Sequence, residues 1–508
     1  MALRARALAT AVVLGMAAFP ALAETWRFVP SIGLTETWSD NINLAIPGLA
    51  TSDLVTEVTP TLTFSGRGSR AFVEGTVSVP LLFYLHTGSY NDDYYPLANI
   101  RGQVEAIEKL FYVEGLVSVS QPVLTPFGAQ PIDLTNATQN RYTSSLYRVS
   151  PFIKRENPGG VQYLLRNDST WVNLDGTPIS TSNSYTSEWT GRIDTPVAPL
   201  GWHADFDLVN VKFNDQNSSQ RTNVARVGPR FAWDPVTRLS AHVGYEDNRY
   251  PLSDYAGAVY GVGLEWQPTE RTRVVANWEH RFFGSSYLFT FDHRTPLSVW
   301  NVTASRLISS YPQQLGTLAA GGSVPVLLDQ LFASRIPDPT QRQQAVNTYI
   351  DSRSLPSQLS SPVDIYTQQI TLNQNVSATM GLLGSRNSLF VTVYRYQTEP
   401  ISASGQVLPP VFGFDNDNTQ LGMSLNWSHN LTPLTVLNLA AYAYRTEGNG
   451  QLGLKTDQGA ARLAITTRLS PNTSAFAGLR YQKLNSDVPG ITDYTESAAF
   501  AGISHFFR

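Results

Sequence analysis

Cysteine is absent from the 508 residues of this chain, and lysine is rare, with five residues against 31 arginines. The lack of thiols excludes a disulfide scaffold, a thiolate metal site, c-type haem attachment and a lipid-modified cysteine. Charged residues make up only 15% of the chain, whereas soluble domains carry about 25%. Because no block of basic residues occurs, the sequence argues against nucleic acid as a partner.

Long hydrophobic runs are also missing: after residue 23 no stretch reaches the ~18 apolar residues of a spanning helix. A shorter run, residues 7–19, follows Arg4 and Arg6 and precedes the small-x-small sequence Ala21-Leu22-Ala23. This order is typical of a secretory signal peptide, so we expect residues 1–23 to be removed by cleavage near Ala23. The sequence therefore predicts an exported protein of a Gram-negative envelope.

Alternation of apolar and polar residues runs through most of the remaining chain. A clear example is the segment 239–246, with the sequence LSAHVGYE. Such alternation indicates a strand with one apolar face and one wet face. The apolar runs often begin or end with an aromatic residue, and the polar positions contain almost no lysine, which is the pattern of a membrane barrel. Soluble β-sandwiches also alternate and are the alternative.

Short turns and long polar loops follow each other along the chain, which is the connection pattern of outer-membrane barrels. Segments 234–237 and 267–270 are short turns, whereas 121–143 and 398–417 are long loops. Counting the alternating runs predicts about 22 strands, within a range of ~18–24. The expected fold class is all-β: residues 24–508 form one transmembrane antiparallel outer-membrane β-barrel, with both ends in the periplasm.

Residues 309–362 interrupt the strand pattern and predict a short two-helix insert. Leu327, Leu328 and Leu331 have helical spacing, and a second helix over 341–350, capped by Asp338 or Thr340, carries Tyr349 on its apolar stripe. Because long structured loops are usually functional, we interpret the insert as a plug or gate of the lumen, with a surface hairpin as the alternative. Strand parity puts it on the outer side, and a slip of one strand puts it in the periplasm, where it could dock a partner.

The polar strand faces are expected to line the lumen, and they carry charges of both signs. Rows of such residues set a transverse field across a pore, and arginine side chains suit acidic sugars. The alternative is a wall that simply faces water. The lumen-lining candidates are Arg226, Arg230, His242, Glu246, Glu265, Arg273, Asn277, Glu279, Arg281, Asp292 and Arg294.

Motifs of known enzymes are missing. There is no Gly-x-Ser-x-Gly elbow, His-Glu-x-x-His pair or Walker loop, and the seven histidines show no metal-ligand spacing. His242 shares a strand face with Glu246, and we expect these two side chains to hydrogen-bond. Asp415 and Asp417 form a weak candidate site for Ca²⁺, with an acidic surface turn as the alternative. We therefore predict no enzyme activity, no catalytic residue, no resident metal and no cofactor.

Two segments resemble one family of barrels. Trp38-Ser39-Asp40-Asn41 is similar to the opening of the outer-membrane barrels associated with PEP-CTERM/exosortase exopolysaccharide loci. The stretch from Leu327 through Ile336-Pro337-Asp338-Pro339 to Arg342 resembles the central insert of that family, and it adds Arg342 to the gate candidates. The resemblance implies a porin-like exit for an exopolysaccharide cargo, surrounded by outer-membrane lipid and served by a periplasmic polysaccharide-export protein.

The sequence alone leaves three candidate functions. The first is a passive outer-membrane conduit for exopolysaccharide export with a helical gate. The second is a diffusion porin for small solutes, and the third is an outer-membrane barrel hydrolase. The scarcity of catalytic constellations disfavours the hydrolase, and the sequence together with the resemblance favours the export conduit.

Overall fold

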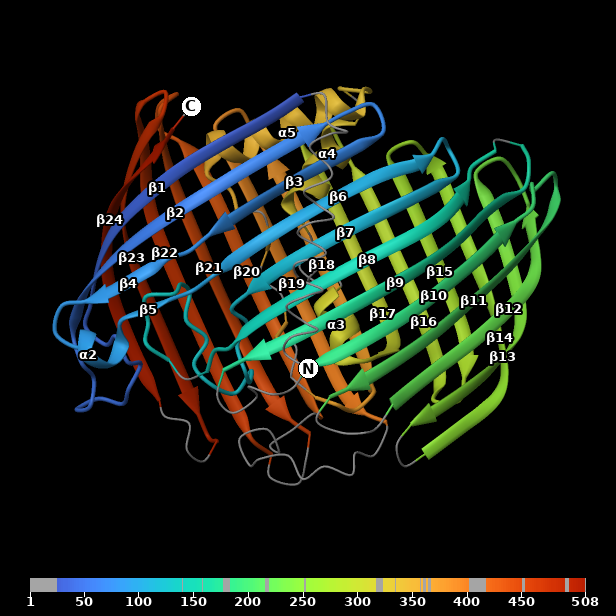
Figure 1. The fold of residues 1–508 in the computed structure, drawn as a ribbon, viewed down its shortest axis with the longest axis horizontal. Coiled ribbons are helices and arrows are strands. Elements are labelled where there is room, and N and C mark those ends of the chain that lie inside the picture. The colour runs from blue at the N-terminus through green and yellow to red at the C-terminus, as the bar shows by residue number, and fades with distance from the viewer. Residues whose placement is uncertain are drawn as a thin grey trace.

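A computed structural model (Figure 1) describes residues 25–507, except 139, 158, 177–182, 215–218, 251–252, 317–322, 334, 357, 360–361, 364–366, 402–416, 450–452 and 489–492. All strands within the described residues belong to one antiparallel sheet. The first strand, β1, pairs with β2 on one side and with the last strand, β24, on the other. The sheet therefore closes into a barrel.

The strands alternate up and down in chain order, except that β4 continues β3 and β6 continues β5 in the same direction. Their bounds are β1 (Thr25–Ser39), β2 (Asp53–Arg67), β3 (Ala71–Ser78), β4 (Leu81–Tyr84), β5 (Asp93–Tyr94), β6 (Leu97–Ile107), β7 (Phe111–Ser120), β8 (Thr143–Arg155), β9 (Gln162–Asp175), β10 (Ser184–Asp194), β11 (Leu200–Phe213), β12 (Ser219–Ala232), β13 (Thr237–Tyr250), β14 (Ser253–Thr269), β15 (Thr272–Arg281), β16 (Gly284–Arg294), β17 (Ser298–Ser309), β18 (Thr371–Leu383), β19 (Asn387–Pro400), β20 (Asn418–Asn430), β21 (Thr435–Gly448), β22 (Lys455–Ser470), β23 (Thr473–Ser486) and β24 (Tyr494–Phe506).

Two wall strands are each divided by a proline. β3 and β4 both pair with β2 and are separated near Pro80, while their partners β6 and β5 are separated near Pro96. Proline has no backbone N–H for the ladder, which explains both interruptions. When each divided pair is counted as one strand, the described residues form a closed barrel of 22 strands. The predicted fold class and strand number are confirmed.

The two ends of the barrel differ. One end, here called the short-turn end, has connections of a few residues, such as 68–70, 270–271 and 471–472. The other, the long-loop end, carries 40–52, 121–142 and 310–370. β1 begins and β24 ends at the short-turn end, as an even number of strands requires.

Apolar side chains cover the outside of the barrel. Val243, Val262 and Leu421 expose 63%, 56% and 57% of their surface, whereas the inward side chains of Glu246 and Glu496 are fully buried. This distribution is the reverse of a soluble protein and matches the alternation expected for strands between lipid and lumen. Among the described residues, no helix is both long and apolar enough to cross a membrane.

The helical insert is longer than expected and contains a third helix. It runs from the end of β17 to the start of β18 and holds α3 (Tyr311–Gly316), α4 (Val324–Phe332) and α5 (Pro339–Arg353), while a short α2 (Gly88–Asn91) lies in another loop. Asp338 is the N-cap of α5, as predicted, since its side chain accepts a hydrogen bond from the Gln341 N–H at 2.7 Å. α5 ends at Arg353, before Ser354 in a left-handed conformation.

Candidate functional site

The insert crosses the interior of the barrel. Although it leaves and rejoins the wall at the long-loop end, α4 and α5 lie at the short-turn end (Figure 1). Gln343 on α5 accepts a hydrogen bond from Arg67 of β2 at 3.2 Å, and the Gln330 carbonyl on α4 accepts one from Arg294 of β16 at 2.9 Å. Because β2 and β16 are on opposite sides of the closed sheet, the two helices span the lumen there.

The three predicted leucines form the contact between α4 and the wall. Leu327, Leu328 and Leu331 are buried in one apolar cluster with Val299 of β17 and Phe390 of β19. Burial of a leucine side chain contributes about 1.5–3 kcal/mol. The cluster therefore holds α4 against the inner wall far more strongly than a surface hairpin would be held.

Polar contacts join α5 to α4 and to the wall. Arg342 donates to Asp329 of α4 at 2.7 Å, and the Tyr349 hydroxyl lies 2.8 Å from the Ser388 hydroxyl of β19. Arg353, which the sequence analysis missed, donates to the same Ser388 at 2.9 Å and lies over the Tyr349 ring. The gate candidates thus fall together at one end of the lumen.

The rest of the insert reaches the long-loop end. In α3, Gln313 donates to Glu188 of β10 at 3.2 Å. After α5, the chain returns past β20, where Gln420 bonds both the N–H and the carbonyl of Val363. The insert thus follows the length of the lumen.

A second segment, the loop 121–142, also folds into the lumen, and sequence reasoning missed it. Asp133 forms an ion pair with Arg480 of β23, and Asn136 donates to Glu496 of β24 at 2.8 Å. Arg480 and Glu496 pair with each other at 2.6 Å, and both are buried. Gln482 bonds Asn136 and Glu496 at 2.9 and 2.6 Å. These residues, Asp133, Asn136, Arg480, Gln482 and Glu496, form what we call the loop latch.

The charge of Asp133 suits this position. Burial by itself raises the pKa of its carboxyl, but the Arg480 guanidinium and hydrogen bonds from Thr135 outweigh it and hold the pKa below 3.8. Asp133 is therefore ionised at neutral pH, and it offsets the charge of a buried arginine.

On the opposite wall, predicted lumen residues form a charge network. Arg226 pairs with Glu279, and also with Asp205 at 2.9 Å and Asp207 at 3.1 Å. His242 Nε2 lies 3.0 Å from the Glu279 carboxylate. We call Arg226, Glu279, Asp205, Asp207 and His242 the wall network.

The expected hydrogen bond between His242 and Glu246 is wrong. Residues four apart on a strand lie about 13 Å apart at ~3.3 Å per residue, too far for a direct contact. Glu246 instead accepts from Arg281 at 2.8 Å and from Asn248 at 3.1 Å.

The remaining lumen candidates share the inner face. Arg281 lies 3.6 Å from Glu279 and so contacts the wall network, whereas the others have different partners. Arg230 pairs with Asp194 at 2.9 Å, and Glu265 with Arg273 at 3.1 Å. Asp292 accepts from Asn301 at 2.8 Å, Arg294 binds the insert, and Asn277 faces Gly263. Strand periodicity thus placed the residues on a face, but their partners on other strands needed the structure.

No cluster of three or more histidine, cysteine, aspartate or glutamate side chains that could hold a metal occurs within the described residues. Of the weak Ca²⁺ candidates, Asp415 lies outside the described residues. Asp417 accepts a hydrogen bond from the Asn449 side chain at 2.6 Å.

No family model matches the chain, and no curated protein matches it. Solved structures with similar architecture include the FrpB iron transporter of Neisseria meningitidis, at 8% identity and a TM-score of 0.46 over 94% of this chain and 82% of that one. The siderophore receptor PirA of Acinetobacter baumannii has 10% identity and a TM-score of 0.47, with coverages of 95% and 81%. OpdK of Pseudomonas aeruginosa, solved with vanillate, has 8% identity and a TM-score of 0.35, with coverages of 94% and 99%. At these values the likeness extends to the barrel architecture of outer-membrane transporters and porins alone.

Proposed function

We propose that this protein is a gated outer-membrane conduit through which an exopolysaccharide leaves the periplasm. In outer-membrane barrels the short turns face the periplasm. The observation that carries the proposal is the position of α4 and α5 across the short-turn end of the lumen. A polymer arriving from the periplasm meets these helices first.

The contacts of the insert suit a gate that is closed at rest. Leu327, Leu328 and Leu331 together contribute about 5–9 kcal/mol of apolar burial, and each polar contact adds about 1 kcal/mol. Thermal motion alone opens such a contact rarely, so opening requires a partner that binds the displaced helices better. A periplasmic polysaccharide-export protein is the partner we propose.

The wall network supports a polar, uncharged or weakly charged cargo. Guanidinium groups donate and carboxylates accept hydrogen bonds, so the wall offers both kinds of partner to sugar hydroxyls. Arg226 faces three carboxylates, Glu279, Asp205 and Asp207, so this part of the wall is net negative and disfavours a strongly anionic polymer. We propose that the cargo slides past this wall without any covalent step and without a cofactor.

Conductance in a planar bilayer tests the gate. The intact protein is compared with a variant lacking 312–358, each with and without dextran as the polymer probe. We expect low conductance from the intact protein, high conductance from the deletion variant, and block of the latter by dextran. Equal, steady conductance from both proteins, unaffected by dextran, contradicts the gate and indicates a diffusion porin for small solutes.

A cross-link provides the matched control. Because the chain has no cysteine, the double variant Arg67→Cys/Gln343→Cys places its only two thiols where β2 meets α5. Joining them with a short cleavable thiol cross-linker should abolish polymer export, and cleaving the linker should restore it. Export that continues with the linker intact would show that α5 does not move.

A further inference from the structure

A hollow of about 790 Å³ lies on the outside of the barrel over β19–β23. Most of its lining residues are outward positions, which alternate with buried inward side chains such as Gln458 and Gln482. Two of its residues, Arg445 on β21 and Lys483 on β23, are each three positions from the end of their strand at the long-loop end. The hollow therefore lies in the half of the wall nearest the long loops.

Residue size explains the hollow. Its floor consists of Ala443, Gly459 and Ala461 on the neighbouring strands β21 and β22. Its sides are larger residues on the flanking strands, including Met423 of β20 and Tyr481 of β23, which expose 53% and 48% of their surface. A groove with a floor of small residues and apolar sides accepts an extended hydrocarbon chain.

The edge of this hollow nearest the long loops has a net positive charge. Arg445 is bonded to Asp457 at 2.6 Å and lies 3.8 Å from Glu447, and Lys455 lies 3.7 Å from the Asp457 carboxylate. Lys483 is exposed and, within the described residues, has no ion-pair partner. Two of the five lysines of the chain therefore lie at this edge.

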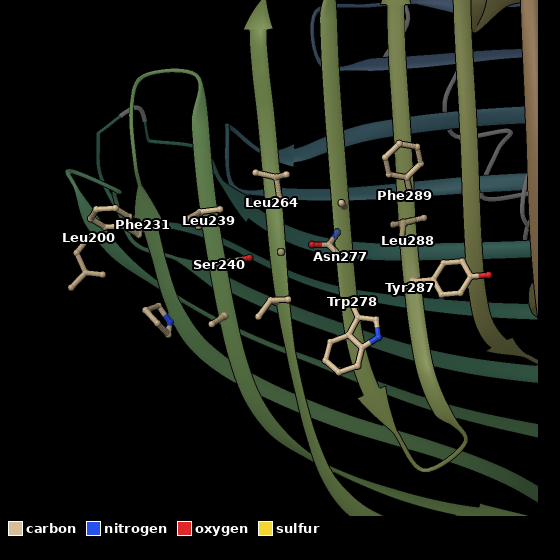
Figure 2. Close-up of a pocket in the computed structure, with 15 residues that line it drawn as sticks. Leu200, Phe231, Leu239, Ser240, Leu264, Asn277, Trp278, Tyr287, Leu288 and Phe289 are labelled. Carbon is tan, nitrogen blue, oxygen red and sulfur yellow. The ribbon is translucent and has the colours of Figure 1, made fainter.

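A second hollow of the same volume, about 790 Å³, provides a comparison (Figure 2). It lies over β11–β16, nearer the short-turn end, and its sides include Leu239, Leu264, Trp278 and Tyr287. No charged side chain lines it. An uncharged hollow is sufficient for any acyl chain, so the cations at the first hollow require a different explanation.

We propose that the hollow over β19–β23 is a binding site for an acylated lipid with phosphate groups on its head group. The acyl chain lies on Ala443, Gly459 and Ala461, and the phosphate is bound by Lys483 and Arg445. Cations near a membrane surface attract anionic head groups, and a compact ammonium group binds phosphate as a point charge. The site depends on the barrel orientation used above, which places the long-loop end in the outer leaflet, but not on polymer transport.

Binding is measured by native mass spectrometry of the full-length protein in detergent containing diphosphorylated lipid A, and again with the dephosphorylated form. We expect retention of the phosphorylated lipid to weaken about fivefold for each cation removed, in Lys483→Gln and Arg445→Gln. Ala461→Phe fills the floor without changing charge, and it should weaken retention of both forms. Lys212→Gln removes an exposed lysine near the same end of β11 and should have no effect.

Two results would overturn the site. Equal retention of the phosphorylated and dephosphorylated lipids shows that the cations do not recognise phosphate. An equal loss in Lys212→Gln and Lys483→Gln shows a general effect of rim charge rather than a site. All four substitutions are on the outer surface of the barrel. Circular dichroism and heat-modifiable migration on gels check that each variant has folded. Lipid retention is measured without conductance, so failure of the lipid site is distinguishable from failure of the export proposal.

Discussion

Arg226 on β12 pairs with Glu279 on β15, although β13 and β14 lie between the two strands. The intervening inner-face positions are glycines: Gly244 stands opposite Arg226, and Gly261 stands opposite Glu279. Without side chains, these two residues leave a flat floor over which the arginine reaches the carboxylate. The wall network therefore depends on two residues that carry no functional group.

The first prediction concerns this floor. A Cβ on Gly261 would lie 2.4 Å from the Trp278 carbonyl oxygen and 2.7 Å from the His242 ring. We expect Gly261→Val to destabilise the barrel by about 2–3 kcal/mol, because overpacking displaces both strands. The measurement is urea unfolding in detergent micelles, followed by tryptophan fluorescence. Gly257→Ala is the control, since it is on the same strand and a Cβ there meets nothing within 4 Å; equal losses from both variants would contradict the floor.

The second prediction concerns the ion pairs themselves. Arg226→Met leaves Asp205 and Asp207 without their ion-pair partner and leaves Glu279 only the more distant Arg281, at 3.6 Å, so we expect a loss of about 3 kcal/mol of unfolding free energy. Adding Glu279→Gln should recover part of that loss, because it removes one of the three neighbouring carboxylate charges. Arg70→Gln breaks an exposed pair with Glu108 and should change stability by less than ~1 kcal/mol. Additive losses in the double variant would argue against a coupled network.

Sequence patterns predicted the barrel because each strand must alternate between lipid and lumen, and this rule is local. Helices α4 and α5 of the insert and the Asp338 cap were predicted for the same reason, whereas α3 was not. Partners on other strands were not, since Arg480 meets Asp133 across 347 positions of the chain. The inward fold of 121–142 also lacked a local signal: its polar composition suits solvent and lumen equally. The one available signal in the sequence was a pair of charged residues on the last two strands, Arg480 and Glu496, which need partners if they face inward.

The third prediction tests α4 as the closing element. Leu328→Ala removes a fully buried side chain from the cluster with Val299 and Phe390, and we expect it to weaken the closed state by about 2–5 kcal/mol. Single-channel recordings should then show frequent openings that the intact protein lacks. Val326→Ala is the matched control, because Val326 lies on the same helix with half of its surface exposed. Openings in both variants, or in neither, would show that the buried contact of α4 does not keep the pore closed.

The last prediction concerns the loop latch and acid. Docking of 121–142 lowers the pKa of Asp133 below 3.8, whereas a released carboxyl titrates near its ordinary value. Its contribution to docking is therefore complete above about pH 4 and is lost as the pH falls through the lowered value. We expect amide exchange in 121–142 to be slow and constant from neutral pH to about pH 5, after correction for intrinsic rates, with faster corrected exchange once the pH falls through the lowered pKa of Asp133. Asp133→Asn should show the faster exchange already at neutral pH, because it leaves Arg480 with Glu496 as its only described charge partner. If exchange in Asp133→Asn matches that of the unaltered chain at every pH, the other hydrogen bonds of the loop, such as those of Asn136 and Gln130, hold it without the charge of Asp133.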